Sequence, residues 1–155
     1  MSWIPPPLIT TRLSLIAPAD SGQTPFADDG RDAVAQSLPG LPANWRIWRD
    51  GQQIGMVGLI RWEPAQRSGE IGFFIAPAAR GCGYMTEAGS VVVAFGFSGM
   101  GLSVIEAKTL PENAASVRVL TNIGMKKVAR IQGRLSSKGP QVDLDLYSIQ
   151  RPPLE

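Results

Sequence analysis

The sequence contains no histidine and a single cysteine, Cys82. The lack of histidine excludes Ser-His-Asp and Cys-His mechanisms and leaves proton transfer to Asp, Glu, Tyr, Lys or water. One cysteine cannot form an internal disulfide, and without histidine it offers no plausible zinc or haem site. We therefore expect neither a structural metal nor a catalytic one.

Long hydrophobic runs are also missing. The longest apolar stretch, residues 91–97, is interrupted by Gly96 and is far shorter than the roughly 20 residues that a membrane helix needs. Residues 1–8 lack a basic start and contain three consecutive prolines, so they are unlike a secretory signal. These features predict a cytoplasmic protein with no membrane role.

The sequence also lacks a large excess of either positive or negative charge. The 15 Lys and Arg residues nearly balance the 13 Asp and Glu residues, and the formal net charge is +2. This balance, without blocks of like charge, gives no indication of nucleic-acid binding. The 17 glycines and 13 prolines follow no repeat, which excludes a collagen-like chain and predicts many turns. A length of 155 residues suits a single domain over residues 1–155.

Apolar periodicity predicts a mixed α/β order with about seven strands. The predicted strands cover residues 9–16, 45–49, 53–60, 70–75, 102–109, 126–131 and 142–149, and the predicted helices cover 85–97 and 114–123. Asp50 and Gly51 suit a tight hairpin turn, because this pair accepts positive φ angles. Asn113 is the expected N-cap of the second helix, and Gly124 its end. Residues 20–44 show little pattern beyond one short helix over 31–38.

One segment carries a chemical signal: residues 77–88, PAARGCGYMTEA, join a predicted strand to a predicted helix. A glycine-rich turn before a helix presents free backbone N–H groups and the positive end of the helix dipole, which suits a phosphate. The Rossmann fingerprint would need Gly or Ala at Thr86, and a P-loop Gly-Lys-Ser/Thr does not occur. A phosphate-binding loop and a helix start that binds nothing remain equal alternatives at this point.

Several segments together resemble the GNAT acyltransferases, and most of all the branch of ribosomal-protein N-terminal acetyltransferases. They are EIGFFIAP at 70–77, RGCGYMTEA at 80–88, NAAS at 113–116 and NIGM at 122–125, and TRLSL at 11–15 resembles that branch's first strand. The resemblance runs from about Ile54 to Ser148. It implies the GNAT fold, a single mixed and mostly antiparallel sheet of about seven strands with helices on both faces. Two central parallel strands, 70–75 and 102–109, would be splayed.

The same resemblance implies acetyl-CoA as the cosubstrate. Its pyrophosphate would lie on the loop in which Arg80 and Gly83 match the family pattern, while Met85 stands where a small residue is expected. Pantetheine would lie between the splayed strands, and a backbone N–H near Phe74 or Ile75, where the family's strand bulges, would polarise the thioester carbonyl. The implied cofactor-binding residues are Phe74, Ile75, Arg80, Gly81, Cys82, Gly83, Tyr84, Met85, Thr86, Asn113 and Ser116.

Catalytic residues are implied more weakly by the resemblance. Glu70 would be the general base, often through water, and the alternative is a solvated carboxylate at a strand start. Leu120 stands where many relatives carry the tyrosine that protonates the leaving thiolate. Ser116 is the substitute in this branch, although a serine here is more often a helix-start residue. Tyr147 is the other available hydroxyl, but a strand tyrosine is more often a packing residue.

The function expected from the resemblance is transfer of an acetyl group from acetyl-CoA to a primary amine of a peptide or small molecule. A non-catalytic acyl-CoA binder or sensor of the same fold is the alternative, whereas Thr86 disfavours a dinucleotide-binding oxidoreductase. We expect Trp45, Trp48 and Trp62 to pack rather than to line an acceptor pocket. Cys82 is expected to be a bystander thiol. The acceptor amine and a homodimeric state stay open.

Overall fold

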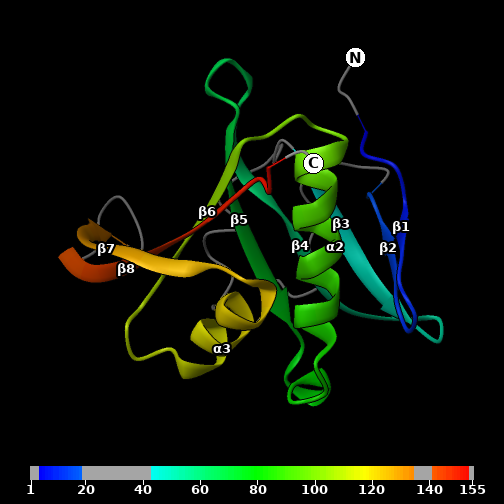
Figure 1. Ribbon diagram of the computed structural model, residues 1–155. Helices are drawn as coiled ribbons and strands as arrows, with labels where there is room; N and C mark the ends of the chain where they lie inside the picture. Colours follow the sequence, from blue (N-terminus) through cyan, green and yellow to red (C-terminus); the bar gives the residue numbers. More distant parts are fainter. Residues whose placement is uncertain (1–3, 19–42, 135–140, 154–155) are drawn as a thin grey trace.

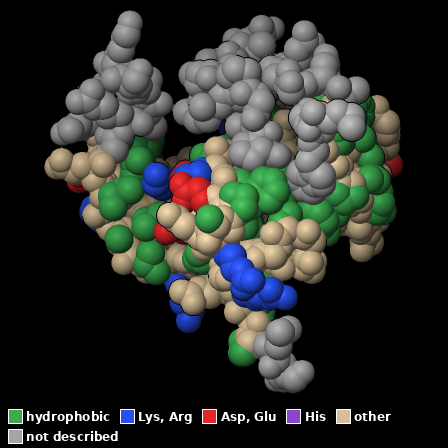
Figure 2. Space-filling view, turned by 90° about the horizontal axis from the view of Figure 1, so that it is seen from above, with side chains coloured by type: hydrophobic (Ala, Val, Ile, Leu, Met, Phe, Trp, Pro, Cys, Tyr) green, Lys and Arg blue, Asp and Glu red, His purple; other side chains and the backbone are tan. Residues whose placement is uncertain are grey.

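The computed structural model describes residues 4–18, 43–134 and 141–153. In these ranges the chain forms one eight-stranded sheet with two α-helices, α2 and α3 (Figure 1). No helix in the described ranges has the length and apolarity to cross a membrane. On the face seen in Figure 2, basic and acidic side chains lie next to one another among hydrophobic and uncharged ones.

The sheet has the order β1-β2-β3-β4-β5-β6-β8-β7, in which β5 and β6 are parallel and all other neighbours are antiparallel. The strands are β1 (Leu8–Ile9), β2 (Ser14–Ile16), β3 (Ala43–Arg49), β4 (Gln52–Glu63), β5 (Ser68–Ile75), β6 (Val104–Thr109), β7 (Lys126–Arg134) and β8 (Gln141–Gln150). The helices are α2 (Tyr84–Ser98) and α3 (Ala114–Ile123), with 3-10 turns η1 (Pro64–Gln66) and η2 (Pro77–Ala79). The predicted mixed, mostly antiparallel α/β sheet is confirmed.

The prediction of one strand over residues 9–16 is wrong, because this segment forms two short strands joined by a turn. The backbone N–H of Thr10 donates to the carbonyl of Leu13 at 2.9 Å, and Leu8 pairs with Leu15 across the hairpin. This turn adds the eighth strand. The hairpin between β3 and β4 is as predicted, with positive φ at Asp50 (51°) and Gly51 (76°). The short helix predicted over residues 31–38 lies outside the described residues.

Helices α2 and α3 contact each other and lie against one face of the sheet (Figure 1). The resemblance implied helices on both faces, and the described residues place both helices on this one. Glycines let them approach closely: a Cβ on Gly96 would lie 2.8 Å from Ile105 of β6, and one on Gly89 only 2.5 Å from Ile123 of α3. The core between helices and sheet includes Trp45, whose indole N–H donates to the Pro6 carbonyl at 2.8 Å and whose ring meets Phe95 edge-on at 5.8 Å. The expected packing role of Trp45 is confirmed.

The two parallel strands separate soon after they meet. Their register pairs are Ser68 with Val104, Gly69 with Ile105 and Glu70 with Glu106, yet β5 continues to Ile75 and β6 to Thr109. Beyond Glu70 the strands diverge, with the start of α2 following one and α3 following the other (Figure 1). The predicted splay is therefore confirmed, and it leaves residues 71–75 of β5 and 107–109 of β6 without backbone pairing to each other, an opening of the sheet called the gap below.

Candidate functional site

The loop from Arg80 to Gly83 directs backbone donors outward at the start of α2. Gly81 and Gly83 have φ of 82° and 79°, a left-handed conformation that glycine adopts without steric cost. Gly83 is the N-cap of α2, and the first intrahelical bond runs from the Glu87 N–H to the Gly83 carbonyl at 3.1 Å. The N–H groups of residues 84–86 therefore have no acceptor within the helix. They form, with the helix dipole, the kind of site that binds phosphates.

The side chains of this loop divide between core and solvent. Tyr84 and Met85 are buried, so they offer a ligand only their backbone groups. Because the Met85 side chain packs in the core, it leaves the loop surface clear although it stands where a small residue was expected. Cys82 is exposed, with its Sγ 3.8 Å from the Arg80 carbonyl, and Thr86 is half-buried.

Arg80 turns back toward the end of β5. Its Nε donates to the Ile75 carbonyl at 3.3 Å, and its guanidinium carbon lies 5.9 Å from the centre of the Phe74 ring. The resemblance predicts Arg80 at the phosphates, but in the structure this side chain is held next to the strand that borders the gap.

The backbone of Ile75 faces the gap. The Ala76 N–H donates to Ile54 of β4 at 2.7 Å, and Ile75 pairs with Gly55. In an antiparallel pair such a pattern directs the N–H and carbonyl of Ile75 away from β4, whereas those of Phe74 point toward it. Of the two N–H groups predicted to polarise a thioester, that of Ile75 is the accessible one.

The predicted strand bulge at Phe74 and Ile75 is not seen in the pairing of β4 with β5. The register is regular there and shifts instead between Leu59 and Arg61 of β4. At Gly55 the two strands lie unusually close, because a Cβ at this position would lie only 2.4 Å from the Phe74 carbonyl oxygen. The glycine thus lets the two backbones approach without a bulge.

The start of α3 lies at the same edge of the sheet, because the carboxyl ends of parallel strands point the same way. The Asn113 side chain accepts a hydrogen bond from the Ser116 N–H at 3.2 Å, and Gly124 ends the helix with φ of 107°. The predicted cap and stop are confirmed. Ser116 is half-buried, while Leu120 (1% exposed) and Tyr147 (6% exposed) pack in the core.

Glu70 occupies the point where β5 and β6 diverge. Its residue is only 7% exposed, and its Oε1 lies 3.4 Å from the Lys108 Nζ and 3.7 Å from the Arg61 Nε. Arg61 also reaches the carboxylate of Glu106 at 3.0 Å. The alternative of a solvated strand-start carboxylate is wrong, because Glu70 is buried within a network of charges.

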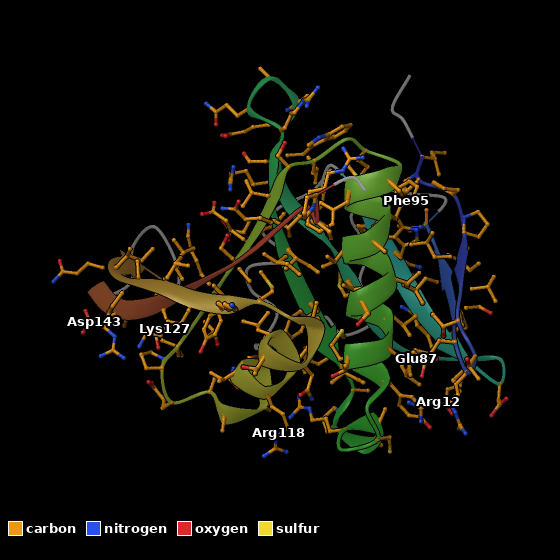
Figure 3. All side chains as sticks on the ribbon, in the orientation of Figure 1. Arg12, Glu87, Phe95, Arg118, Lys127 and Asp143 are labelled. Carbon is orange, nitrogen blue, oxygen red and sulfur yellow. The ribbon has the colours of Figure 1, made fainter. Side chains whose placement is uncertain are left out.

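A cluster that sequence reasoning missed connects the β1–β2 turn to α2. The Glu87 carboxylate accepts hydrogen bonds from the Thr10 hydroxyl, from the Arg12 backbone N–H at 3.0 Å and from the Arg12 Nε at 2.8 Å (Figure 3). Desolvation raises the pKa of Glu87, but these hydrogen bonds and the Arg12 charge outweigh it and lower the pKa below the ordinary value. Since 75 residues separate Arg12 from Glu87, no local pattern indicates their contact.

A second cluster lies on β7 and β8. Asp145 is buried, its Oδ1 lies 2.8 Å from the Arg130 Nε, and its Oδ2 lies 3.4 Å from the Lys127 Nζ. The hydrogen bond from Arg130 is the main reason why the pKa of Asp145 lies below its ordinary value. Asp145 pairs with Thr109, so this cluster sits beside the end of β6.

Comparison with known proteins gives a consistent result. A family model described as "Acetyltransferase (GNAT) domain" matches residues 18–126. The chain is 35% identical over 122 residues to the "Uncharacterized N-acetyltransferase YoaA" of Bacillus subtilis (strain 168), covering 77% of this chain and 68% of that protein.

Solved structures share the fold. Mycobacterium smegmatis RimJ in complex with CoA-disulfide superposes with a TM-score of 0.66 at 26% identity, covering 77% of this chain and 60% of that one. The ribosomal-protein-S5-alanine acetyltransferase from Vibrio fischeri gives a TM-score of 0.64 at 24% identity, covering 69% of this chain and 60% of that one, which shows the fold alone. The chain thus spans about three fifths of the length of these two structures.

Proposed function

The chain belongs to the GNAT family of acetyl-CoA-dependent acyltransferases, and from this premise we propose that it transfers an acetyl group to a primary amine by direct attack in a ternary complex. The observation that carries the proposal is the gap between β5 and β6, bordered at one edge of the sheet by the loop before α2 and the start of α3.

The residues around this gap fit acetyl-CoA. The N–H groups of residues 84–86 and the left-handed glycines suit a pyrophosphate. The backbone groups of Phe73, which point away from β4, suit an amide of an extended pantetheine arm. Asn113 and Ser116 lie at the start of α3, which follows the carboxyl end of β6. These are the residues that would hold the cosubstrate.

Bound acetyl-CoA supplies the acetyl group as a thioester, and the chain supplies the polar groups around it. The Ile75 N–H can donate to the thioester carbonyl oxygen, where negative charge develops during attack. The Ser116 hydroxyl, one helical turn beyond Asn113, can donate a proton to the leaving thiolate. Leu120 has no proton to donate, and the hydroxyl-bearing Tyr147 is packed in the core.

Glu70 would accept the proton of the attacking amine through water. Its carboxylate is already shared by Arg61 and Lys108, which suits an acceptor that needs little help to lose a proton. At pH 7 a lysine side chain with a reference pKa of about 10.4 costs roughly 4.6 kcal/mol to deprotonate, while an α-amine near 7.8 costs only about 1.1 kcal/mol. The site therefore favours an α-amine, such as a protein N-terminus, over a lysine side chain. A small-molecule amine of similar basicity would meet the same requirement.

A non-catalytic acyl-CoA binder is the second candidate, and two observations favour it. The position of the family's tyrosine is taken by the buried Leu120, and Glu70 is held in ion pairs. Such a protein would bind acetyl-CoA and leave it intact whichever amine is offered.

The two candidates are separated by measuring free coenzyme A thiol with acetyl-CoA and a panel of amines. The panel contains peptides with a free N-terminus, the same peptides with a blocked N-terminus and a free lysine, and small polyamines. We expect thiol release with a free α-amine and an acetylated product by mass spectrometry. Calorimetric binding of acetyl-CoA without release for any amine would instead support the binder.

A further inference from the structure

The turn between β1 and β2 brings a cation to the start of α2. Thr10 closes this turn, because its N–H donates to the Leu13 carbonyl at 2.9 Å and its hydroxyl accepts from the Leu13 N–H at 3.0 Å. Arg12 lies in the turn, and its backbone N–H and Nε both bond Glu87 in the first turn of α2. Two donors from one residue to one carboxylate fix the guanidinium in position.

The free end of this guanidinium lies beside the N-cap. The guanidinium carbon is 4.5 Å from the centre of the Tyr84 ring, and Nη2 is 3.5 Å from the place that a Cβ on Gly83 would occupy. Within the described residues, the hydrogen bonds of Arg12 use its backbone N and its Nε. Over the described ranges, no protein group accepts a hydrogen bond from either Nη group, so both can donate to a ligand.

Arg80, the cation that the motif predicts for the phosphates, is placed differently. Its Nε donates to the Ile75 carbonyl and its guanidinium lies over Phe74, at the end of β5. Gly83, in contrast, has Arg12 as the nearest side chain to its missing Cβ. The Arg49 guanidinium also lies over Tyr84, but its central carbon is 5.2 Å from the ring centre against 4.5 Å for Arg12. Among the described arginines, the one nearest the start of α2 thus comes from the first hairpin of the sheet.

We propose that Arg12 is a cofactor-binding residue whose Nη groups contact the phosphates of acetyl-CoA on the loop before α2. The inference rests on the proposed function, since it assumes that acetyl-CoA occupies this loop. Glu87 then has a positioning role, because it orients Arg12 while the dipole of α2 favours its own negative charge.

Two variants separate a contact with phosphate from a purely structural role. Arg12→Gln and Glu87→Gln both break the Arg12–Glu87 ion pair, so both should lower the melting temperature by a similar amount. Only Arg12→Gln removes the positive charge. We expect it to weaken acetyl-CoA binding, measured by calorimetry, by about tenfold, the order for one charge-assisted hydrogen bond. Glu87→Gln keeps an acceptor oxygen that can still orient Arg12 and removes a negative charge near the phosphates, so it should leave the affinity unchanged or raise it.

The salt dependence of acetyl-CoA affinity also distinguishes the two roles, because a purely structural Arg12 would not affect it. Between about 50 and 300 mM NaCl, binding to the wild type should weaken more steeply than binding to Arg12→Gln, because screening acts on the charge that the variant lacks. Arg67→Gln is the matched control, since it removes an exposed arginine at the opposite end of β5 and should retain the wild-type slope. If Arg12→Gln does not fold, Arg12→Lys tests the same point. A lysine keeps the charge and the salt slope but lacks the two Nη groups, so acetyl-CoA affinity should fall, whereas a purely structural role predicts wild-type affinity.

Equal losses of affinity in Arg12→Gln and Glu87→Gln, with unchanged salt slopes, would overturn the inference and leave Arg12 as a residue that only fastens the hairpin. A wild-type protein that does not bind acetyl-CoA would overturn the proposed function, and this inference with it. Binding by the wild type that is retained in Arg12→Gln refutes the role of Arg12 alone.

Discussion

Gly83 lies in an open turn, with φ of 79° and, among the residues that the structure describes, only the Arg12 guanidinium near its missing Cβ. We predict that Gly83→Asp abolishes measurable acetyl-CoA binding. An aspartate there would add bulk and negative charge where the pyrophosphate lies, and its carboxylate would compete for Arg12. Calorimetry with acetyl-CoA, on protein shown to be folded by circular dichroism, makes the measurement.

Gly101→Asp provides the control for backbone strain. Gly101 also has a positive φ, 70°, and open space around it, but it lies before β6, away from the loop. Both substitutions should cost roughly 1 kcal/mol of stability because an L side chain disfavours this conformation. Only Gly83→Asp should lose affinity, and a folded Gly83→Asp protein with wild-type affinity would refute the assignment of the loop.

Glu70 is the residue whose role depends most on its surroundings. With an α-amine acceptor, we predict that Glu70→Gln slows turnover by no more than about sixfold at pH 7, the penalty for finding the amine neutral. The effect should shrink at pH 9, where the amine is already deprotonated. Initial rates of thiol release at both pH values, with the acceptor found in the amine panel, give the ratio.

Glu106→Gln is the matched control for the ion-pair network, because Glu106 also binds Arg61 but pairs with Glu70 from the neighbouring strand. The ratio of the Glu106→Gln turnover rate to the wild-type rate should be the same at pH 7 and pH 9. A ratio of Glu70→Gln to wild-type rate that stays flat between pH 7 and 9 counts against Glu70 as the base.

Alternation along the strand predicted which face Glu70 occupies, but its partners come from β4 and β6 and could not be read from the local pattern.

Asn113, the N-cap of helix α3, is expected to have two roles that mutations can distinguish. Asn113 caps the helix through its side-chain oxygen, and we propose that it also contacts the cofactor. We predict that Asn113→Asp keeps the melting temperature, because aspartate caps equally well, but loses acetyl-CoA affinity. Asn113→Ala should in addition cost about 1 kcal/mol of stability. Thermal melts and calorimetry on the same preparations make the comparison.

Asn113→Ser distinguishes loss of the amide from repulsion by a new charge. Serine keeps the cap without a negative charge, so reduced affinity in this variant would identify the amide as the contact. Wild-type affinity in the serine and aspartate variants, with normal melting, would leave Asn113 as a helix cap only.

Most elements of the sheet and both described helices could be predicted because each is encoded locally. Asp50 and Gly51 set the hairpin turn, and Asn113 and Gly124 bound α3. The prediction of a single strand over residues 9–16 was wrong because apolar and polar side chains keep alternating across Arg12. The turn itself depends on the hydrogen bond between Thr10 and Leu13 and on Glu87 from a distant helix. A turn held by tertiary contacts has no Gly or Pro to mark it.

Across the whole molecule, the site divides into a part that is contiguous in sequence and a part assembled by folding. The loop before α2 could be located because its glycines and the following helix are adjacent in the chain. Two ion pairs form only when the chain has folded and the strands are in register: Arg12 with Glu87, and Asp145 with Arg130. Motif matching located the loop but not the residue that the fold places beside its N-cap.

These two carboxylates also make stability depend on pH. The pKa of Glu87 lies below its ordinary value of 4.5, so the folded protein binds fewer protons than the unfolded chain near that pH. Its contribution is complete above the ordinary value and is lost as the pH falls through the lowered one. The same reasoning applies to Asp145, whose pKa is lowered from 3.8.

We therefore predict that the wild-type melting temperature falls steeply below about pH 5, and that Glu87→Gln melts lower at pH 7 but loses less on acidification. The two curves should converge at low pH, because protonation of Glu87 then removes in the wild type what the substitution has already removed. Asp143→Asn, which changes an exposed carboxylate of β8, should follow the wild-type curve. Parallel curves for Glu87→Gln and wild type from pH 7 to 3 would show that the ion pair between hairpin and helix does not contribute to acid stability.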